Sequence, residues 1–132
     1  KGAADVSPYG ESDEELEDAL LDAGLRVPGR LWKHLFPHQR TCVQWLWELH
    51  RQEAGGVVGD EMGLGKTLQV VGLWAALQHS GRAGPCLVVS PATVMRQWVR
   101  ELRRWAPEIE TALLHNSTGA SDPATRSKLV RG

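Results

Sequence analysis

The 132-residue sequence has few of the residues that build disulfide or metal scaffolds. Its two cysteines, Cys42 and Cys86, lie far apart in apolar stretches, and its five histidines show no metal-ligand spacing. We therefore expect no disulfide framework or zinc site, but two buried free thiols in a reducing compartment. No apolar run approaches the roughly 20 residues that cross a bilayer, and no signal segment opens the chain, so we expect no membrane partner. The chain starts at Lys1 rather than Met, and we interpret it as a piece of a longer protein.

The net charge is small, but charges of the two signs are unevenly distributed. The formal net charge is −1, with 42% hydrophobic and 23% charged residues, as in ordinary globular domains. Residues 1–25 carry eight acids against one lysine, whereas residues 26–132 carry fourteen Lys or Arg against eight acids. We predict an acidic arm over 1–25 and a mildly basic body over 26–132 that suits a polyanion. The arm either shades that body by mimicking a polyanion or is simply a solvated face.

The order of apolar patterns predicts an α/β fold. In the arm, a capping box at Ser12 and the spacing of Leu16, Ala19, Leu20 and Ala23 predict a short amphipathic helix. In the body, helices are expected from Pro37 to about Gln52, from Lys66 to about Gln78 and from Thr93 to Trp105. Strands are expected at 57–58, 86–89 and 111–115. This alternation predicts a parallel sheet flanked by helices, incomplete at its carboxyl end.

The most informative segment is a phosphate-binding loop between the first strand and the second helix of the body. Its residues after Gly59 are Asp60, Glu61, Met62, Gly63, Leu64, Gly65, Lys66 and Thr67. Glycines let backbone N–H groups approach phosphate oxygens at a helix start, Lys66 reaches the β- and γ-phosphates, and Thr67 offers its hydroxyl to Mg²⁺. Asp60 stands where the usual pattern has its first glycine. The alternative is a glycine-rich turn with a solvated lysine.

Three segments in fixed order resemble one family. They are Leu35-Phe36-Pro37-His38-Gln39, the phosphate loop, and the run from Leu87 to Trp98. Over roughly residues 30–118 they are similar to the opening motifs of the SWI/SNF-like ATPases, which are double-stranded-DNA translocases of the helicase-like superfamily. That family commonly lacks the first glycine. Further matches, such as Trp45-Leu46-Trp47-Glu48-Leu49-His50, look most like the Cockayne syndrome group B subfamily of transcription-coupled repair proteins.

The resemblance implies a RecA-like first ATPase lobe that uses ATP and Mg²⁺. Gln39 then reads adenine, because a carboxamide donates and accepts hydrogen bonds at once; the alternative is a surface glutamine. Phe36 flanks the base or belongs to the core, and Trp32 is expected in the core. The family's acidic pair, which holds magnesium and orients water, is expected beyond residue 132, so no catalytic residue is assigned within this chain.

The resemblance also implies contact with the DNA backbone through Pro91, Thr93 and Arg96. Thr93 suits a phosphate contact, a helix cap, or both. Arg96, Arg100 and Arg103 or Arg104 recur at helical spacing, and this stripe is either a DNA track or a solvated face that includes Glu101.

The function implied is that of a nuclear, DNA-dependent ATPase acting in DNA repair or chromatin remodelling. Double-stranded DNA is the expected partner, with RNA polymerase or the nucleosome engaged through a larger protein. Two alternatives remain at the level of sequence. One is a non-catalytic nucleotide-binding or protein-interaction module, and the other is a small P-loop kinase, against which Asp60 and the Gln39 segment argue.

Overall fold

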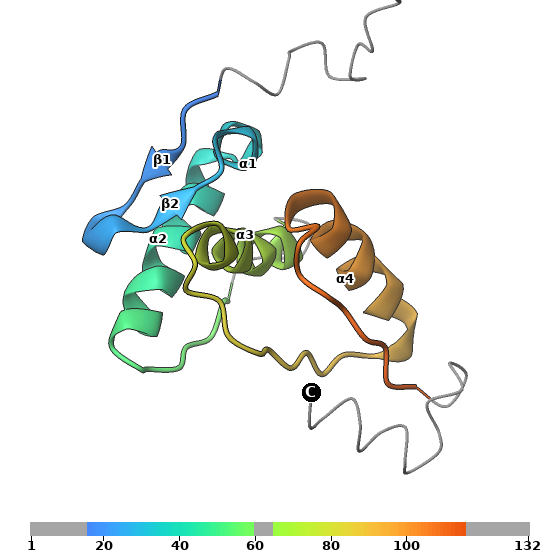
Figure 1. Cartoon of the computed structure of the whole chain (residues 1–132). Coiled ribbons are helices and arrows are strands. Elements are labelled where there is room, and N and C mark those ends of the chain that lie inside the picture. Colours follow the sequence, from blue (N-terminus) through green and yellow to red (C-terminus); the bar gives the residue numbers. More distant parts are fainter. Residues whose placement is uncertain (1–15, 60–64, 116–132) are drawn as a thin grey trace, which may run out of the picture. The chain divides into compact units, whose positions relative to one another are not determined.

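The computed structural model describes residues 16–59 and 65–115, and the chain divides into two units, Lys1–Ala83 (unit 1) and Gly84–Gly132 (unit 2). Unit 1 contains β1 (Ala19–Leu20), the 3-10 turn η1 (Asp22–Gly24), β2 (Arg26–Val27), α1 (Gly29–His34), α2 (Pro37–Arg51) and α3 (Lys66–His79) (Figure 1). Unit 2 contains α4 (Ala92–Trp105). The three long helices predicted from apolar spacing are confirmed, with ends within a residue or so of those expected.

Helices α2 and α3 pack against each other and, with β2 lying on α3, build the core of unit 1. Val43 of α2 and Val71 of α3 have no exposed surface. A β-carbon on Gly72 would lie 3.2 Å from Val43 Cγ2. Glycine costs a helix interior about 1 kcal/mol relative to alanine, so this close approach of α2 explains why α3 carries it.

The amino-terminal segment differs from the prediction. Residues 16–24 do not continue the expected amphipathic helix, whose start lies outside the described residues. Ala19 and Leu20 instead pair antiparallel with Val27 and Arg26. The intervening turn places Ala23 and Gly24 in the left-handed region. The physical reason is tertiary, because the hairpin buries Leu25 and Val27 completely, and such burial contributes about 1.5–3 kcal/mol per side chain. The division at residue 25 stays a prediction, although β1 and β2 pair across it.

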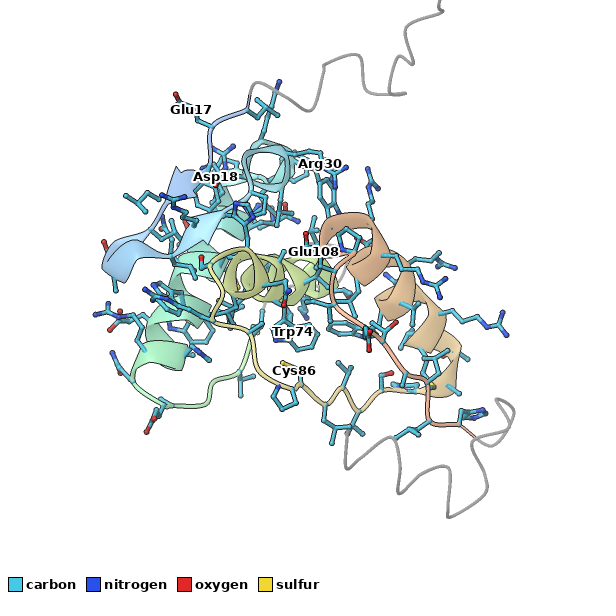
Figure 2. The ribbon with its side chains drawn as sticks, viewed as in Figure 1. Glu17, Asp18, Arg30, Trp74, Cys86 and Glu108 are labelled. Atoms are coloured by element: carbon cyan, nitrogen blue, oxygen red, sulfur yellow. The ribbon has the colours of Figure 1, made fainter. Side chains whose placement is uncertain are left out.

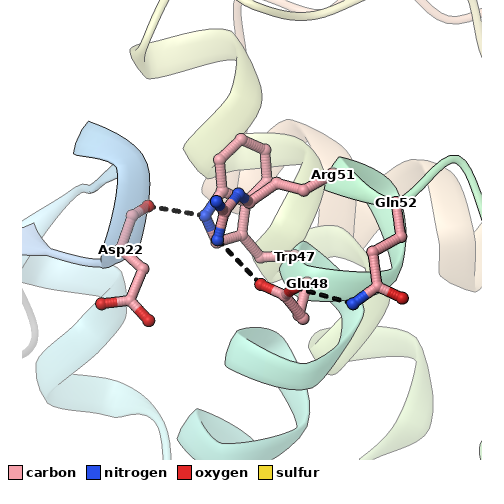
Figure 3. Close-up of polar contacts among 5 residues, drawn as sticks. All are labelled: Asp22, Trp47, Glu48, Arg51 and Gln52. Atoms are coloured by element: carbon pink, nitrogen blue, oxygen red, sulfur yellow. Dashed lines mark hydrogen bonds and ion pairs between the residues drawn. The ribbon is translucent and has the colours of Figure 1, made fainter.

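Polar contacts hold this hairpin on the helices behind it. The indole N–H of Trp47 in α2 donates to the Asp22 carbonyl oxygen at 2.8 Å (Figure 3). The Arg82 guanidinium donates to the Ala23 carbonyl oxygen at 3.0 Å and lies 5.6 Å from the centre of the Trp47 ring. Because Trp47 is 4% exposed, its indole both fills the core and satisfies a backbone group of the turn.

Exposed polar and charged pairs contribute less stability to this arrangement. Glu48 pairs with Arg51 at 2.8 Å and accepts from Gln52 at 2.8 Å at the end of α2 (Figure 3). His79 at the end of α3 lies 2.7 Å from an Asp18 carboxylate oxygen. Surface pairs of this kind contribute roughly 0–1 kcal/mol each, so we assign the position of the hairpin mainly to burial and to Trp47.

The predicted parallel sheet is not formed among residues 16–59 and 65–115, where the one sheet is the β1–β2 pair. The segments 57–58, 86–89 and 111–115 have no strand pairing. Val57, Leu87 and Val89 are more than 80% exposed. An apolar run shows that a segment can be buried on both faces, but a parallel ladder also needs a neighbouring strand, and the pattern within one run does not specify that neighbour.

The cysteines correct a further expectation. Both thiols are free, but Cys86 is exposed and Cys42 is half-buried, so the prediction of two buried thiols is wrong. Cys86 lies on the extended segment that precedes α4 (Figure 2). Partial desolvation raises the pKa of its thiol above the ordinary value. The thiolate is the reactive form, so this shift opposes reactivity at neutral pH.

Replacing Trp47 by Phe should destabilise unit 1 by about 1–3 kcal/mol, because the buried indole is lost and the Asp22 carbonyl loses its donor in a part-buried hydrogen bond. Trp45→Phe in the same helix is the matched control, since Trp45 is 41% exposed and should tolerate the change with a smaller loss. Urea unfolding followed by far-UV circular dichroism measures both. Equal losses for the two variants would show that the Trp47–Asp22 bond contributes nothing specific.

Candidate nucleotide site and nucleic-acid interface

The start of α3 has the backbone geometry of an anion site. Gly65 precedes the helix in the left-handed conformation (φ 77°, ψ 43°), and Lys66 and Thr67 are the first two helical residues. No side chain among the described residues caps this end. Its leading N–H groups and the positive end of the helix dipole are thus available to an anion, and Lys66 adds a full charge beside them.

Gln39 lies against the same glycine. It occupies the third position of α2, after Pro37, and its Oε1 accepts a hydrogen bond from the Phe36 N–H at 2.8 Å. Its Nε2 occupies the space that a β-carbon on Gly65 would need. Two residues that the sequence assigned to one site, 26 positions apart, are therefore in contact where α2 and α3 begin. The alternative of a surface glutamine is excluded, since Gln39 is 4% exposed.

Near Gln39, the structure shows how far two aromatic residues, Phe36 and Trp32, are buried. Phe36 is 65% exposed and stacks on His38, with ring centres 6.0 Å apart and planes 12° apart. Phe36 is therefore not part of the core. Trp32 is half-buried, and Arg40 donates to its carbonyl oxygen at 3.0 Å while lying over its ring. Trp32 thus connects α1 to α2 and is no part of an open aromatic surface.

These residues fit a Mg²⁺–nucleotide as far as the structure describes them. The half-buried Lys66 and Thr67 stand at an uncapped helix start, with a buried carboxamide behind the glycine. The other predicted loop residues lie outside the described residues: Asp60, Glu61, Met62, Gly63 and Leu64. Within the described ranges, no group of three or more His, Cys, Asp or Glu side chains is arranged to hold a metal ion directly.

Sequence reasoning missed Gln69, a fully buried polar residue in the first turn of α3. Its N–H donates to the Gly65 carbonyl oxygen at 3.1 Å and closes the first helical hydrogen bond. A glutamine among the apolar residues of this helix was the available signal. The contact between Gln39 and Gly65 had a signal too, because proline followed two residues later by glutamine is typical of a capped helix start.

The predicted DNA-contact residues lie together at the start of α4 in unit 2. Pro91 is the residue before the helix, Thr93 is its second residue, and Arg96 follows one turn later. All three are exposed. The suggested role of Thr93 as the helix cap is wrong, because Thr93 lies inside the helix and Pro91 precedes it without a capping side chain. The Thr93 hydroxyl is thus not used in capping. No helix among the described residues is both long and apolar enough to span a membrane.

Replacing Gly65 by Ala should cost more stability than the same change at Gly81. Both glycines are left-handed, with φ of 77° and 68°, which is a strain of about 1–2 kcal/mol for alanine. Only at Gly65 would the new methyl displace the Gln39 carboxamide; around Gly81 the described structure has open space. The additional loss of stability at Gly65, relative to Gly81, should disappear when Gly65→Ala is made in a Gln39→Ala background. Urea unfolding of Gly65→Ala, Gly81→Ala, Gln39→Ala and the Gln39/Gly65 double variant measures this difference. Equal losses of stability at Gly65 and Gly81 would contradict the contact.

The chain is similar to known proteins of one family. Residues 38–131 match the family of SNF2-related domains. The chain is 48% identical over 116 residues to the DNA excision repair protein CSB of Oryza sativa subsp. japonica, covering 88% of the chain and 10% of that protein. It is 47% identical to the DNA repair and recombination protein RAD26 of Saccharomyces cerevisiae, covering 86% of the chain and 11% of that protein. The DNA excision repair protein ERCC-6 of Homo sapiens is 46% identical over 92% of the chain, which spans 9% of it.

The chain therefore spans about a tenth of the length of these curated relatives. The family match covers more than half of the chain and includes Gln39, Lys66, Thr67 and α4. Membership in a helicase-like ATPase family implies the α/β fold class, of which the described residues form the helices and one short sheet. The chain belongs to the SNF2-related domain family, and within that family it is CSB-like.

Proposed function

We propose that this chain is the ATP-binding portion of a DNA-dependent ATPase that translocates on double-stranded DNA in transcription-coupled repair. One observation carries the proposal: left-handed Gly65 begins α3 against the buried Gln39, with Lys66 and Thr67 next in the chain. A solvated glycine-rich turn would not need a buried carboxamide behind it. The names of the CSB, RAD26 and ERCC-6 relatives support the repair role.

In the proposed site, residues Asp60 to Thr67 surround the phosphates of ATP. Backbone N–H groups at the start of α3 donate to phosphate oxygens, Lys66 reaches the β- and γ-phosphates, and the Thr67 hydroxyl ligates Mg²⁺. Mg²⁺ held there by Thr67 would supply positive charge that stabilises the phosphates. The residues of this chain would therefore position ATP and stabilise its charge, and they would transfer no proton.

Gln39 is proposed to read adenine and to hold the loop at the same time. Its Oε1 already accepts from the Phe36 N–H, and an amide oxygen has a second lone pair. Its Nε2 lies at Gly65. A base bound beside Phe36 and His38 would meet an exposed stacked pair of rings. Adenine binding and loop geometry would then be coupled through one side chain.

DNA contact is proposed for Pro91, Thr93 and Arg96 at the start of α4. Their exposure and the uncapped N–H groups there suit phosphate oxygens. In the longer protein, we expect the segments 57–58, 86–89 and 111–115 to be strands of the parallel sheet of a RecA-like lobe. RNA polymerase or the nucleosome as larger partners, and a nuclear location, belong to the same proposal.

Replacing Lys66 by Ala should weaken Mg²⁺–ATP binding about tenfold to a hundredfold, because a charge-assisted contact contributes about 1.5–3 kcal/mol. Lys33→Ala, at an exposed lysine of α1, is the control and should leave the affinity unchanged. Titration calorimetry measures both. Equally weak binding by the unmodified chain and by Lys66→Ala would favour a protein-interaction module instead.

The 132-residue chain alone should hydrolyse ATP negligibly, with or without duplex DNA. The acidic pair and the second lobe, whose arginines stabilise the transferred phosphoryl group, are expected in other parts of the longer protein. A coupled phosphate-release assay tests this. DNA-stimulated turnover by these residues, retained in Lys66→Ala, would contradict both the prediction and the assigned role of Lys66.

A further inference from the structure

Three arginines on α4 differ from Arg40 and Arg82 in how the chain uses them. In unit 1, Arg40 donates to the Trp32 carbonyl and Arg82 to the Ala23 carbonyl. In the part of the chain that the structure describes, the side chains of Arg96, Arg100 and Arg103 make no hydrogen bond or ion pair within the molecule, and all three are exposed. Nitrogen-tipped side chains extend outward from α4 in Figure 2.

The spacing aligns these arginines with the predicted DNA contact. At 100° per residue, Thr93, Arg96, Arg100 and Arg103 fall within an arc of about 80° on one face of α4. At 1.5 Å per residue they extend over roughly 15 Å from the uncapped start of the helix. The opposite side carries the buried Leu102 and Trp105.

The stability of the helix does not explain this arrangement. Arg96 and Arg100 are four residues apart and Arg100 and Arg103 three apart, so like charges face each other at a cost of about 0.2–0.5 kcal/mol per pair. None of the three has an acid three or four residues away. The helix dipole stabilises Arg103 in the last turn but does not stabilise Arg96 or Arg100.

Arg104 makes the contrast clear. It has Glu101 three residues before it and Glu108 four residues after it, and it lies 4.8 Å from the centre of the Trp105 ring. Arg104 thus has partners within the protein, whereas its three neighbours have none among the described residues and are open to an anion from outside. A row of anions over this length describes a nucleic-acid backbone, whose phosphates supply one charge per 3.4 Å of each strand.

We infer that Arg96, Arg100 and Arg103 form one phosphate-tracking face, and that Arg100 and Arg103 extend the DNA contact about two turns beyond the start of α4. This inference rests on the proposed function, since it assigns further residues to the same DNA interface. The occupant is the duplex backbone, which the exposed Thr93 hydroxyl and helix start also suit. The contact carries no sequence information, because it reads only phosphates.

The test is the salt dependence of binding by the full chain to a 30-base-pair duplex of arbitrary sequence, measured by fluorescence anisotropy between 25 and 150 mM salt. Each neutralised phosphate contributes about 0.9 to the slope of log affinity against log salt. Arg100→Gln with Arg103→Gln should therefore lower the slope by about 1.8. Arg26→Gln with Arg51→Gln removes the same charge from unit 1 and should leave the slope nearly unchanged.

The outcomes separate this inference from the proposed function. If Arg96→Gln lowers the slope and the Arg100/Arg103 double variant matches the unit 1 control, the extension is overturned and the DNA-dependent function stands. If the unmodified chain does not bind the duplex at 25 mM salt, both are overturned. A polyglutamate chain is the second probe. Loss of polyglutamate binding in the double variant, equal to its loss of DNA binding, would make the face a site for acidic protein and overturn the assignment to DNA.

Discussion

Where α2 and α3 begin, the Gln39 side chain occupies the space beside Gly65, and much of unit 1 depends on this contact. Gln39 closes the start of α2 through the Phe36 N–H, while Gly65 can turn into α3 only with a positive φ and without a side chain. Any larger residue at 65 would displace the carboxamide. The two helices then pack along Val43, Val71 and Gly72, so a local contact between helix starts continues directly into the core.

The charged and polar side chains that the structure describes fall into two groups, those with partners within the protein and those without. In unit 1 they hold the amino-terminal hairpin and the helix ends, as Trp47, Arg82 and Glu48 illustrate. Such contacts are satisfied within the protein, and removing them affects stability. Lys66 at the start of α3 and the arginine face of α4 are different, because their surroundings supply no matching anion among the described residues. Charges in such surroundings are open to ligands, and the proposed ones are the phosphates of ATP and of DNA.

Family membership and geometry support each other without repeating each other. Identity of 46–48% to CSB, RAD26 and ERCC-6 covers most of the chain, but it does not say how the sequence motifs meet in space. The contact of Gln39 with Gly65 provides that link for the proposed ATP site. The spacing of Thr93, Arg96, Arg100 and Arg103 provides it for the proposed DNA contact.

By itself the sequence determined the three long helices and the phosphate-binding pattern, because Pro37, the start at Lys66 and the apolar spacing of α4 are local signals read within one or two turns. It also named Gln39, Lys66 and Thr67 as one site. Only tertiary structure decided that residues 16–27 form a hairpin, since the burial of Leu25 and Val27 outweighs the helical spacing of Leu16 to Ala23. Strand pairing was likewise beyond local patterns. The apolar runs at 57–58 and 86–89 need neighbours far away in the chain, and a ladder forms only when those neighbours are in place.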